Sequence, residues 1–349
     1  MAIIPIHPDF QIQEQHFTNV SEFLNYIQLY HPDDFIFLQQ FLDSRTETIT
    51  VKTSGSTGTP KTISLSKTAM LASAEATGTF FDLPAGTRAL LCLSSDYIAG
   101  KMMWVRALHL GWHSIVVPVD SHPMQHTSDT FDFAAMVPLQ VQQSLPELHR
   151  IKTLIIGGAP ISYALKQELL QVSTHCYQTY GMTETITHIA VKEISNNPSK
   201  QYYKTLPNIQ LSVDDRGCLL IDAPLLNPDP IVTNDIVKLI SPNTFEWLGR
   251  YDNVINSGGV KLFPEQIEAL LSPVFDKPFF IAALPDVKLG QKVVLVIESK
   301  QQIPDLNLQL LEVPLTRYEN PKEIRYLPSF VYTKNNKINR KETLSLLRK

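Results

Sequence analysis

Short runs of β-branched and apolar residues alternate with amphipathic stretches along most of the chain, a pattern typical of α/β proteins. Several apolar runs alternate too little to expose one face, which favours parallel strands buried on both faces. Helices are predicted at 67–81, where Ser66 can act as the N-cap, at 100–110 and at 162–171. Strands are predicted at 48–53, 61–66, 88–93, 113–119, 131–138, 152–158 and 175–181.

The pattern changes twice in the second half of the chain. Short strands and Pro- or Asn-rich turns at 196–243, with a hairpin turn at 214–217, predict a small β subdomain. A new α/β stretch follows, with a helix at 264–271, strands at 279–286 and 292–299, and a helix near Lys341. We therefore predict a large N-terminal domain of α/β layers at 1–251 and a small C-terminal α+β domain at 252–349.

Composition agrees with two folded domains. The 349 residues exceed what one compact core usually spans, and 44% hydrophobic with 18% charged residues excludes a disordered chain. The three cysteines are far apart and in no C-x-x-C spacing, so neither a zinc site nor a disulfide framework is expected. There is no apolar run of about 20 residues and no leader-like start, so we expect a cytoplasmic protein with no membrane partner.

The charge of the chain is unevenly distributed. The net charge is −4, acidic residues outnumber basic ones up to Asp252, and basic residues outnumber acidic ones after it. This asymmetry indicates a C-terminal domain that meets phosphate groups rather than a nucleic-acid partner, and a random scatter of surface charge explains it equally well.

The segment TSGSTGTPK at 53–61 is the strongest local motif. Glycines let the main chain approach an anion, and successive N–H groups with Ser, Thr and Lys side chains supply donors. The spacing does not fit G-x-x-x-x-G-K-[ST], which excludes a Walker-type kinase or ATPase. Taken alone, an ordinary surface loop is the alternative. The predicted phosphate-binding residues are Thr53, Ser54, Gly55, Ser56, Thr57, Gly58 and Lys61.

The order of the later motifs resembles the adenylate-forming superfamily of acyl-CoA synthetases, nonribosomal adenylation domains and luciferases. These motifs are GGAP at 157–160, YGMTET at 180–185, VTND at 232–235, GRYD at 249–252 and NNKINR at 335–340. The resemblance runs from Thr48 to the end and says little about 1–47. It implies an enzyme that uses ATP, Mg²⁺ and CoA and acts on small molecules, with a mobile C-terminal lid.

The resemblance also implies a role for individual residues. Lys337, Thr183 and Glu184 are the predicted catalytic residues, and Glu184 is the predicted Mg²⁺ ligand. Tyr180 is expected to stack on adenine, Asp235 and Arg250 to contact the ribose, and Asp252 to be the hinge. The remaining nucleotide-binding residues are Gly158, Ala159, Pro160, Gly181 and Met182, and the predicted CoA-binding residues are Gly258, Gly259 and Lys261. Without the resemblance, the Gly-Gly pair is a plain turn and Lys337 a surface lysine.

Within the superfamily, the segment at 97–106 and the run GMTETITH look most like the o-succinylbenzoate-CoA ligases of menaquinone biosynthesis. Their substrate has two carboxylates, so the one that is not activated needs a cationic or hydrogen-bonding anchor. Lys101, Arg106 and His188 are the candidates. Lys101 and Arg106 are five residues apart on a helix, so they are not expected to share one face. Arg106 pairing with a carboxylate and His188 as a satisfied core imidazole are the structural alternatives.

Several departures from the family pattern leave other functions open. The phosphate loop begins at Thr53, where relatives have a much larger preceding subdomain, which leaves a surface that a second subunit of a homodimer would cover. Asn234 stands where the family has glycine, and Asn253 where it has a second aspartate. The alternatives are a ligase for another aryl or acyl acid, transfer to a carrier protein, and a nucleotide-binding relic without catalysis.

Overall fold

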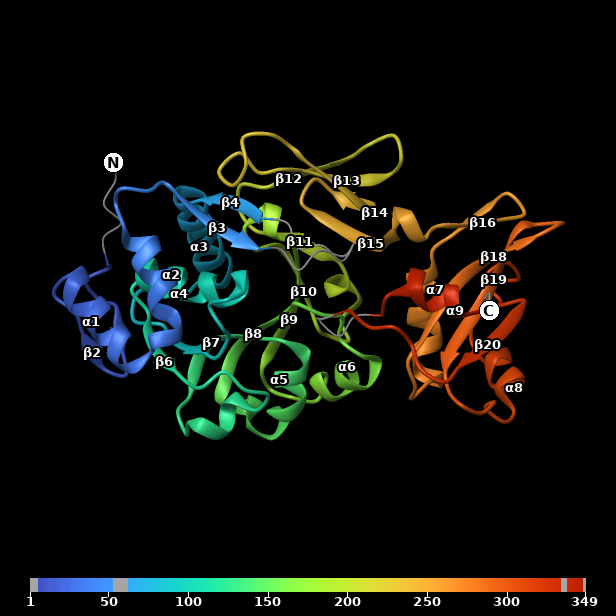
Figure 1. Ribbon diagram of the computed structural model, residues 1–349, viewed down its shortest axis with the longest axis horizontal. Coiled ribbons are helices and arrows are strands. Elements are labelled where there is room, and N and C mark those ends of the chain that lie inside the picture. The colour runs from blue at the N-terminus through green and yellow to red at the C-terminus, as the bar shows by residue number, and fades with distance from the viewer. Residues whose placement is uncertain (1–5, 53–61, 334–337, 348–349) are drawn as a thin grey trace.

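The computed structural model describes residues 6–52, 62–333 and 338–347. A parallel sheet lies at the centre of the larger part of the molecule (Figure 1). Its strands run in the spatial order β9-β8-β7-β5-β6. They are β5 (Arg88–Leu91), β6 (His113–Val116), β7 (Phe131–Met136), β8 (Ile151–Ile156) and β9 (His175–Gly181).

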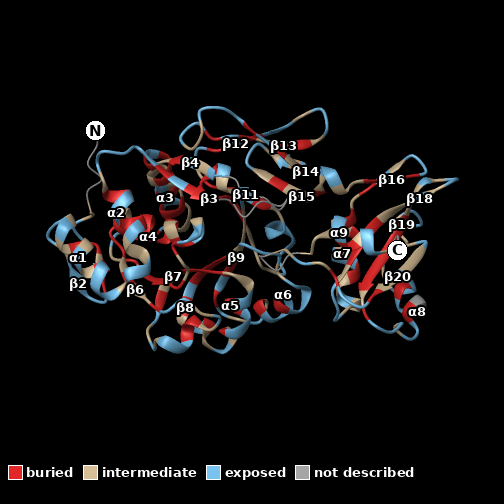
Figure 2. Cartoon of the chain, in the orientation of Figure 1, coloured by how far each residue is buried: buried red, intermediate tan, exposed pale blue. Residues whose placement is uncertain are grey.

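Both faces of this parallel sheet are covered, because successive side chains of a strand point to opposite faces. Ala89, Leu91 and Phe133 pack into one core with residues of the N-terminal helices, whereas Leu90 and Ala134 pack into a second core with residues of α5 and α6. Figure 2 shows buried residues running along these strands. The helices of the first core are α1 (Val20–Tyr30), α2 (Pro32–Leu42), α3 (Lys67–Phe81) and α4 (Ile98–Leu110), and those of the second are α5 (Pro138–Gln143) and α6 (Tyr163–Leu169).

Antiparallel strands extend the same sheet beyond β9. β10 pairs antiparallel with β9, and the sheet continues in the order β11, β15, β14, β13 and β12. The predicted β subdomain therefore shares its hydrogen-bonded sheet with the parallel strands. These strands are β10 (His188–Glu193), β11 (Tyr203–Thr205), β12 (Gln210–Val213), β13 (Cys218–Asp222), β14 (Ile231–Ser241) and β15 (Thr244–Arg250). At the opposite edge lie β1 (Gln11–Ile12) and β2 (Gln15–His16), and β3 (Thr48–Lys52) pairs with β4 (Thr62–Ser66).

A second sheet forms after β15, at the far end of the molecule in Figure 1. Alternating residues of β19 again pack into two cores, one with residues of α7 and α8 and one that includes Phe280 and Phe330. Asp252 lies between β15, a strand of the first sheet, and β16, a strand of the second sheet. The elements are β16 (Ile255–Ser257), β17 (Val260–Leu262), α7 (Pro264–Leu271), β18 (Phe279–Asp286), β19 (Gly290–Glu298), α8 (Leu306–Leu311), β20 (Glu323–Leu327) and α9 (Arg340–Leu346).

The structure confirms the α/β class and most predicted elements. α3 spans the predicted residues, and the Ser66 side chain accepts a hydrogen bond from the main-chain N–H of Ala69. α7, β9 and β18 also have the predicted bounds, and β12 and β13 form the predicted hairpin. α4 begins two residues earlier than predicted, at Ile98, and α6 is shorter, at Tyr163–Leu169.

Gly100 fixes how closely α4 approaches the end of the preceding strand. A Cβ at this position would lie 2.1 Å from the main-chain oxygen of Ser94 and 2.6 Å from that of Leu93. We expect Gly100→Ala to lower the free energy of unfolding by about 1–3 kcal/mol, because main-chain atoms must move to relieve the overlap.

Urea unfolding of Gly100→Ala beside Gly78→Ala tests this expectation. Gly78 also lies within a helix, but its added Cβ would meet the flexible end of Leu110 at 2.9 Å. The gain in helix propensity should then offset most of the contact cost. Equal losses in the two variants would contradict the close approach of α4.

Candidate functional site

Two predicted nucleotide segments lie side by side at the carboxyl ends of β8 and β9. β8 and β9 pair in parallel, with Ile156 opposite Gln178, and Gly158, Ala159 and Pro160 follow β8 as exposed residues. The Thr179 hydroxyl donates to the Ile156 carbonyl across the pair at 3.2 Å. Ligands of parallel sheets bind at this edge. The structure thus brings the 157–160 and 180–185 motifs together.

The segment after β9 turns sharply back into β10. Thr183–Thr185 forms one 3₁₀ turn, in which Thr183 is half-buried and Glu184 is exposed. Ile186 has a positive φ of 65°, a strained conformation for a β-branched residue, and such strain occurs mostly at functional sites. The turn brings His188 opposite Gly181, where a Cβ on the glycine would lie 2.3 Å from the Thr187 oxygen.

Arg106 and His188 meet in the interior of the protein. One terminal nitrogen of the Arg106 guanidinium lies 3.5 Å from His188 Nδ1, and the Arg106 Nε donates to the Thr77 hydroxyl at 3.3 Å. The other terminal nitrogen lies 3.7 Å from Met103 Sδ. Arg106 is only 1% exposed. No carboxylate of the described ranges pairs with it, so the predicted alternative of an ion pair is not what these residues form.

The electrostatics of this pair point to an anion. Burial lowers the pKa of the Arg106 guanidinium to about 9, so it stays charged at neutral pH. Burial first, and then the Arg106 charge, lower the pKa of His188 well below its usual value. The imidazole is therefore neutral, and because Nδ1 faces the guanidinium donor, the proton belongs on Nε2. His188 Nε2 is buried and has no hydrogen-bond partner among the described residues. A buried cation without a carboxylate partner among the described residues and a buried donor without a hydrogen-bond partner cost free energy, which an anionic group bound beside them would recover.

Lys101 lies elsewhere. Its ammonium group donates to the Ser95 carbonyl and lies 4.5 Å from the centre of the Phe37 ring on α2. Burial lowers the pKa of Lys101. The prediction that Lys101 and Arg106 face different ways holds, and of the three candidate anchors the structure joins only Arg106 and His188.

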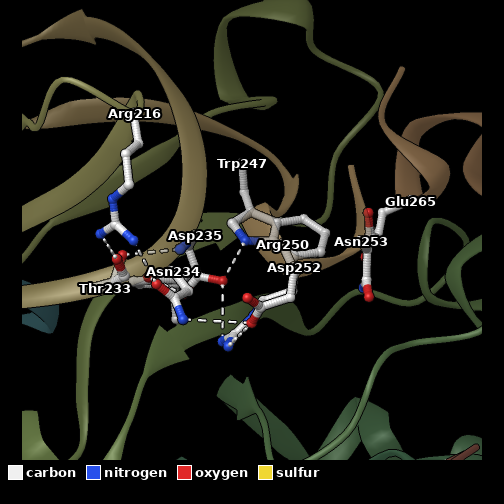
Figure 3. A network of polar contacts seen from close by, with 10 residues as sticks. Arg216, Thr233, Asn234, Asp235, Trp247, Arg250, Asp252, Asn253 and Glu265 are labelled. Carbon is white, nitrogen blue, oxygen red and sulfur yellow. Dashed lines mark hydrogen bonds and ion pairs between the residues drawn. The ribbon is translucent and has the colours of Figure 1, made fainter. Parts of the chain in front are cut away.

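Asp235 is the centre of a polar network on β14 and β15 (Figure 3). Its Oδ2 accepts a hydrogen bond from the Tyr180 hydroxyl at 2.7 Å, and its Oδ1 accepts from Trp247 Nε1 at 3.2 Å. An Arg250 terminal nitrogen lies 3.6 Å from Oδ1. Burial, followed by the Asp235 charge, raises the pKa of Tyr180, so the phenol keeps its proton. The predicted adenine and ribose residues therefore share one cluster.

The predicted hinge residue, Asp252, contacts the same cluster. Asp252 lies in a 3₁₀ turn, where its carboxylate is 3.7 Å from Arg250 and accepts a hydrogen bond from Asn234 Nδ2 at 3.4 Å. The Asn234 oxygen accepts in turn from Arg216 at 3.0 Å. Asn234, where the family pattern has glycine, thus connects the ribose motif to Asp252 (Figure 3).

The C-terminal elements touch this region through α7. Asn253 Nδ2 donates to Glu265 Oε1 at 2.5 Å, and Gln266 Nε2 donates to the main-chain oxygen of Trp247 at 3.0 Å. Gly258 and Gly259 form the turn between β16 and β17, and both have positive φ, as a tight hairpin requires. The turn itself thus accounts for these glycines, and a CoA-binding role for them and for the exposed Lys261 stays a prediction.

Several predicted residues lie outside the described part of the chain: Thr53, Ser54, Gly55, Ser56, Thr57, Gly58, Lys61 and Lys337. Sequence reasoning in turn missed Trp247, Thr77, Met103 and Arg216. Trp247, Thr77 and Arg216 contact Asp235, Arg106 and Asn234, which are distant from them in sequence, whereas Met103 contacts Arg106 one helical turn away, a spacing that could have indicated the contact. Within the described residues no group of three or more His, Cys, Asp and Glu side chains is arranged to hold a metal ion, and none of the helices has the length and apolar character to span a membrane.

Comparisons with known proteins identify relatives of this chain. The sequence family described as AMP-binding enzyme matches residues 51–222. A 2-succinylbenzoate–CoA ligase from Salmonella typhimurium is 27% identical over 310 residues, which cover 83% of this chain and 66% of the relative. The chain thus spans slightly less than two thirds of that relative.

Solved structures extend the similarity. An acyl-CoA synthetase (AMP-forming)/AMP-acid ligase II-like protein from Dyadobacter fermentans is 38% identical, with 91% of this chain and 95% of that chain covered and a TM-score of 0.62. An o-succinylbenzoate CoA synthetase from Bacillus subtilis, solved with ATP and magnesium, is 18% identical, with 84% and 69% covered and a TM-score of 0.71. At 18% identity, the similarity to the Bacillus subtilis structure is a similarity of fold.

Proposed function

Because the chain belongs to the AMP-binding enzymes, we propose that it is an AMP-forming acid–CoA ligase that acts on o-succinylbenzoate. In the first step, a carboxylate oxygen of the acid attacks the α-phosphorus of ATP, the bond to the bridging oxygen breaks, and pyrophosphate leaves. In the second, the CoA thiol attacks the acyl carbon, loses its proton, and AMP leaves. The product is o-succinylbenzoyl-CoA, an intermediate on the way to menaquinone, made in the cytoplasm.

The observation that carries this choice of substrate is the pairing of Arg106 with His188. Their guanidinium and Nε2–H groups are buried without a protein carboxylate among the described residues. They match the second carboxylate of a dicarboxylic aryl acid, whereas the ring of that acid needs the apolar surroundings that Met103 offers. The names of the relatives from Salmonella and Lactococcus support the same substrate.

The residues at the carboxyl ends of β8 and β9 would hold the nucleotide. Tyr180, Asp235 and Arg250 form one cluster, in which the ribose hydroxyls of ATP would bind the carboxylate. Lys61, Lys337 and the Thr183 hydroxyl would face the phosphates, where negative charge accumulates during the first step. Glu184 is an exposed carboxylate that follows Thr183 in the same turn, and it suits Mg²⁺, a cation that prefers oxygen ligands and keeps several waters. When bound, Mg²⁺ neutralises charge on the phosphate oxygens.

The second step requires the C-terminal elements to move. Turning about Asp252 would withdraw Lys337 and present Gly258, Gly259 and Lys261 to CoA, as the family resemblance implies. Among the described residues, the hydrogen bonds of α7 with β15 and the turn after it run from Asn253 to Glu265 and from Gln266 to the main-chain oxygens of Trp247 and Leu248. Polar contacts of this kind can exchange at low cost.

The test is product analysis by mass spectrometry. The purified protein is incubated with ATP, Mg²⁺ and CoA, together with o-succinylbenzoate, benzoate or a fatty acid in separate reactions. We expect AMP and a mono-CoA thioester from o-succinylbenzoate at a rate far above that with benzoate, and no thioester from the fatty acid. A faster reaction with another acid would keep the reaction class and overturn the carboxylate anchor, whereas no AMP with any acid would favour a nucleotide-binding relic.

Replacing Glu184 by glutamine is expected to raise the Mg²⁺ concentration needed for half-maximal AMP release by about tenfold, because a neutral amide is a weaker ligand than a carboxylate. Titration of AMP release with Mg²⁺ measures this shift. The matched control is Glu193→Gln, at the far end of β10. Superimposable titrations of Glu184→Gln and the native protein would remove Glu184 from the metal site.

A further inference from the structure

Asp235 is a buried residue, only 6% exposed, and its carboxylate has hydrogen-bond or ion-pair partners on both oxygens. Tyr180 donates to one oxygen, and Trp247 and Arg250 face the other. A carboxylate has about four acceptor positions, so this set leaves room for further donors. The two neutral donors lie on different oxygens, and together they fix the rotation of the carboxylate about its last bond.

Trp247 is itself fixed in place from two directions. Its strand is paired with β14, where Trp247 lies opposite Val237 and a register shift separates that pair from Gly249 opposite Ile236. Its main-chain oxygen accepts a hydrogen bond from Gln266 Nε2 on α7 at 3.0 Å, and the oxygen of Leu248 accepts from the same group at 3.2 Å. The main chain that positions the indole N–H beside Asp235 is therefore also in contact with α7.

We propose that Trp247 is a positioning residue for nucleotide binding, whose indole N–H holds the Asp235 carboxylate in the orientation that accepts the ribose hydroxyls. This inference rests on the proposed function, because it places the nucleotide ribose at Asp235. Without the indole donor, the Oδ1 atom keeps only Arg250, at 3.6 Å, among its partners in the described part of the chain, and the carboxylate can turn toward the guanidinium. The free-energy cost of restoring the orientation of the Asp235 carboxylate would then offset part of the binding free energy of the ribose.

The expected consequence is specific to the ribose. Trp247→Phe keeps an aromatic ring and removes the donor, so the affinity for AMP should fall about tenfold, the value of one hydrogen bond to a charged group. The affinity for an AMP analogue that lacks both ribose hydroxyls should fall much less, because that analogue makes no hydrogen bond to Asp235. In turnover, KM for ATP should rise while kcat changes less than about twofold.

The experiment is calorimetric titration of the native protein, Trp247→Phe and Trp112→Phe with AMP and with 2′,3′-dideoxy-AMP. Trp112 is a matched control, because it is fully buried in another core and its Nε1 has no partner among the described residues. We expect the preference for AMP over the dideoxy analogue to shrink in Trp247→Phe and to stay native in Trp112→Phe. An unchanged preference in Trp247→Phe would overturn the proposal.

A measurement on the native protein covers the case in which Trp247→Phe does not fold. The chain has three tryptophans, so its indole N–H groups give three nuclear magnetic resonance signals, and Trp104→Phe and Trp112→Phe assign the remaining one to Trp247. AMP should shift the Trp247 signal more than the dideoxy analogue does, and equal shifts would overturn the proposal. Failure of the proposed function is distinct, because it appears as absent AMP release by the native protein while the binding preference persists.

Discussion

Replacing Arg106 by methionine is expected to lower kcat/KM for o-succinylbenzoate by about 10²–10³ while leaving the protein as stable as the native form or more so. The loss of activity reflects a charge-assisted hydrogen bond to a carboxylate in a buried site, which contributes about 3–4 kcal/mol when the partner is left unpaired. Stability should not fall, because the buried charge that binds the carboxylate also costs folding free energy while the site is empty. Arg106 has no carboxylate partner in the described part of the chain, and its described neighbours include Met103 and Thr77.

Opposite changes in activity and stability distinguish a substrate anchor from a structural residue. A buried cation that pairs with a protein carboxylate destabilises the fold by several kcal/mol when it is removed, because the partner stays behind uncompensated. Removal of Arg106 leaves no such carboxylate among the residues that the structure describes, and the flexible methionine side chain can fill most of the space. Functional sites often keep groups that cost stability in the absence of ligand.

The measurement combines thermal unfolding with steady-state kinetics on two acids. Kinetics with benzoate, which has no second carboxylate, should respond to Arg106→Met far less than kinetics with o-succinylbenzoate. Arg88→Met is a suitable control for stability, since Arg88 is part-exposed and forms an ion pair with Asp129 at 2.9 Å. A clear drop in melting temperature together with equal loss of activity on both acids would make Arg106 a structural residue.

The course of the strands and helices could be predicted because their signals are local. α3 has its N-cap in sequence at Ser66, and several of the strands from β5 to β9, such as β7 and β8, are largely apolar because helices cover both faces. The continuity of β10 to β15 with the parallel sheet was not predicted. It depends on the sharp turn at Ile186, whose positive φ no β-branched residue favours, and tertiary packing must therefore impose it.

The candidate site could be predicted only where a motif is contiguous. The 157–160 and 180–185 segments lie together because the strands before them are neighbours, a rule of parallel sheets. The sequence offered Lys101 and Arg106 equally as candidate anchors, and only the packing of α4 shows that their surroundings differ. Lys101 faces Phe37 on α2, whereas Arg106 faces Thr77 on α3 and His188. Likewise, the hydrogen bond from Trp247 to Asp235 depends on the register of β14 with β15 and on its shift beside Ile236.

Replacing Lys337 by alanine is expected to abolish formation of the acyl-adenylate, with a loss of at least about 10²–10³ in rate, while CoA thioester formation from supplied o-succinylbenzoyl-adenylate proceeds at nearly the native rate. In the first step two anionic groups must approach each other, and a lysine placed at the developing charge stabilises that transition state alone. In the second step the attacking thiol meets an acyl carbon whose leaving group is already AMP. A group that serves only the first step can then be lost without effect on the second.

The two half-reactions are measured separately, by ATP–pyrophosphate exchange and by thioester formation from the adenylate. Lys341→Ala is the matched control, because Lys341 is an exposed residue of α9 close in sequence to Lys337. It should leave both steps intact, which separates a specific lysine from the general positive charge of this segment. Retention of the second step also shows that the Lys337 variant is folded and that its pocket still binds the acyl group. If both steps decline in parallel, Lys337 acts on folding or on binding of the common intermediate. The proposal that each orientation of the C-terminal domain serves one half-reaction would then be wrong.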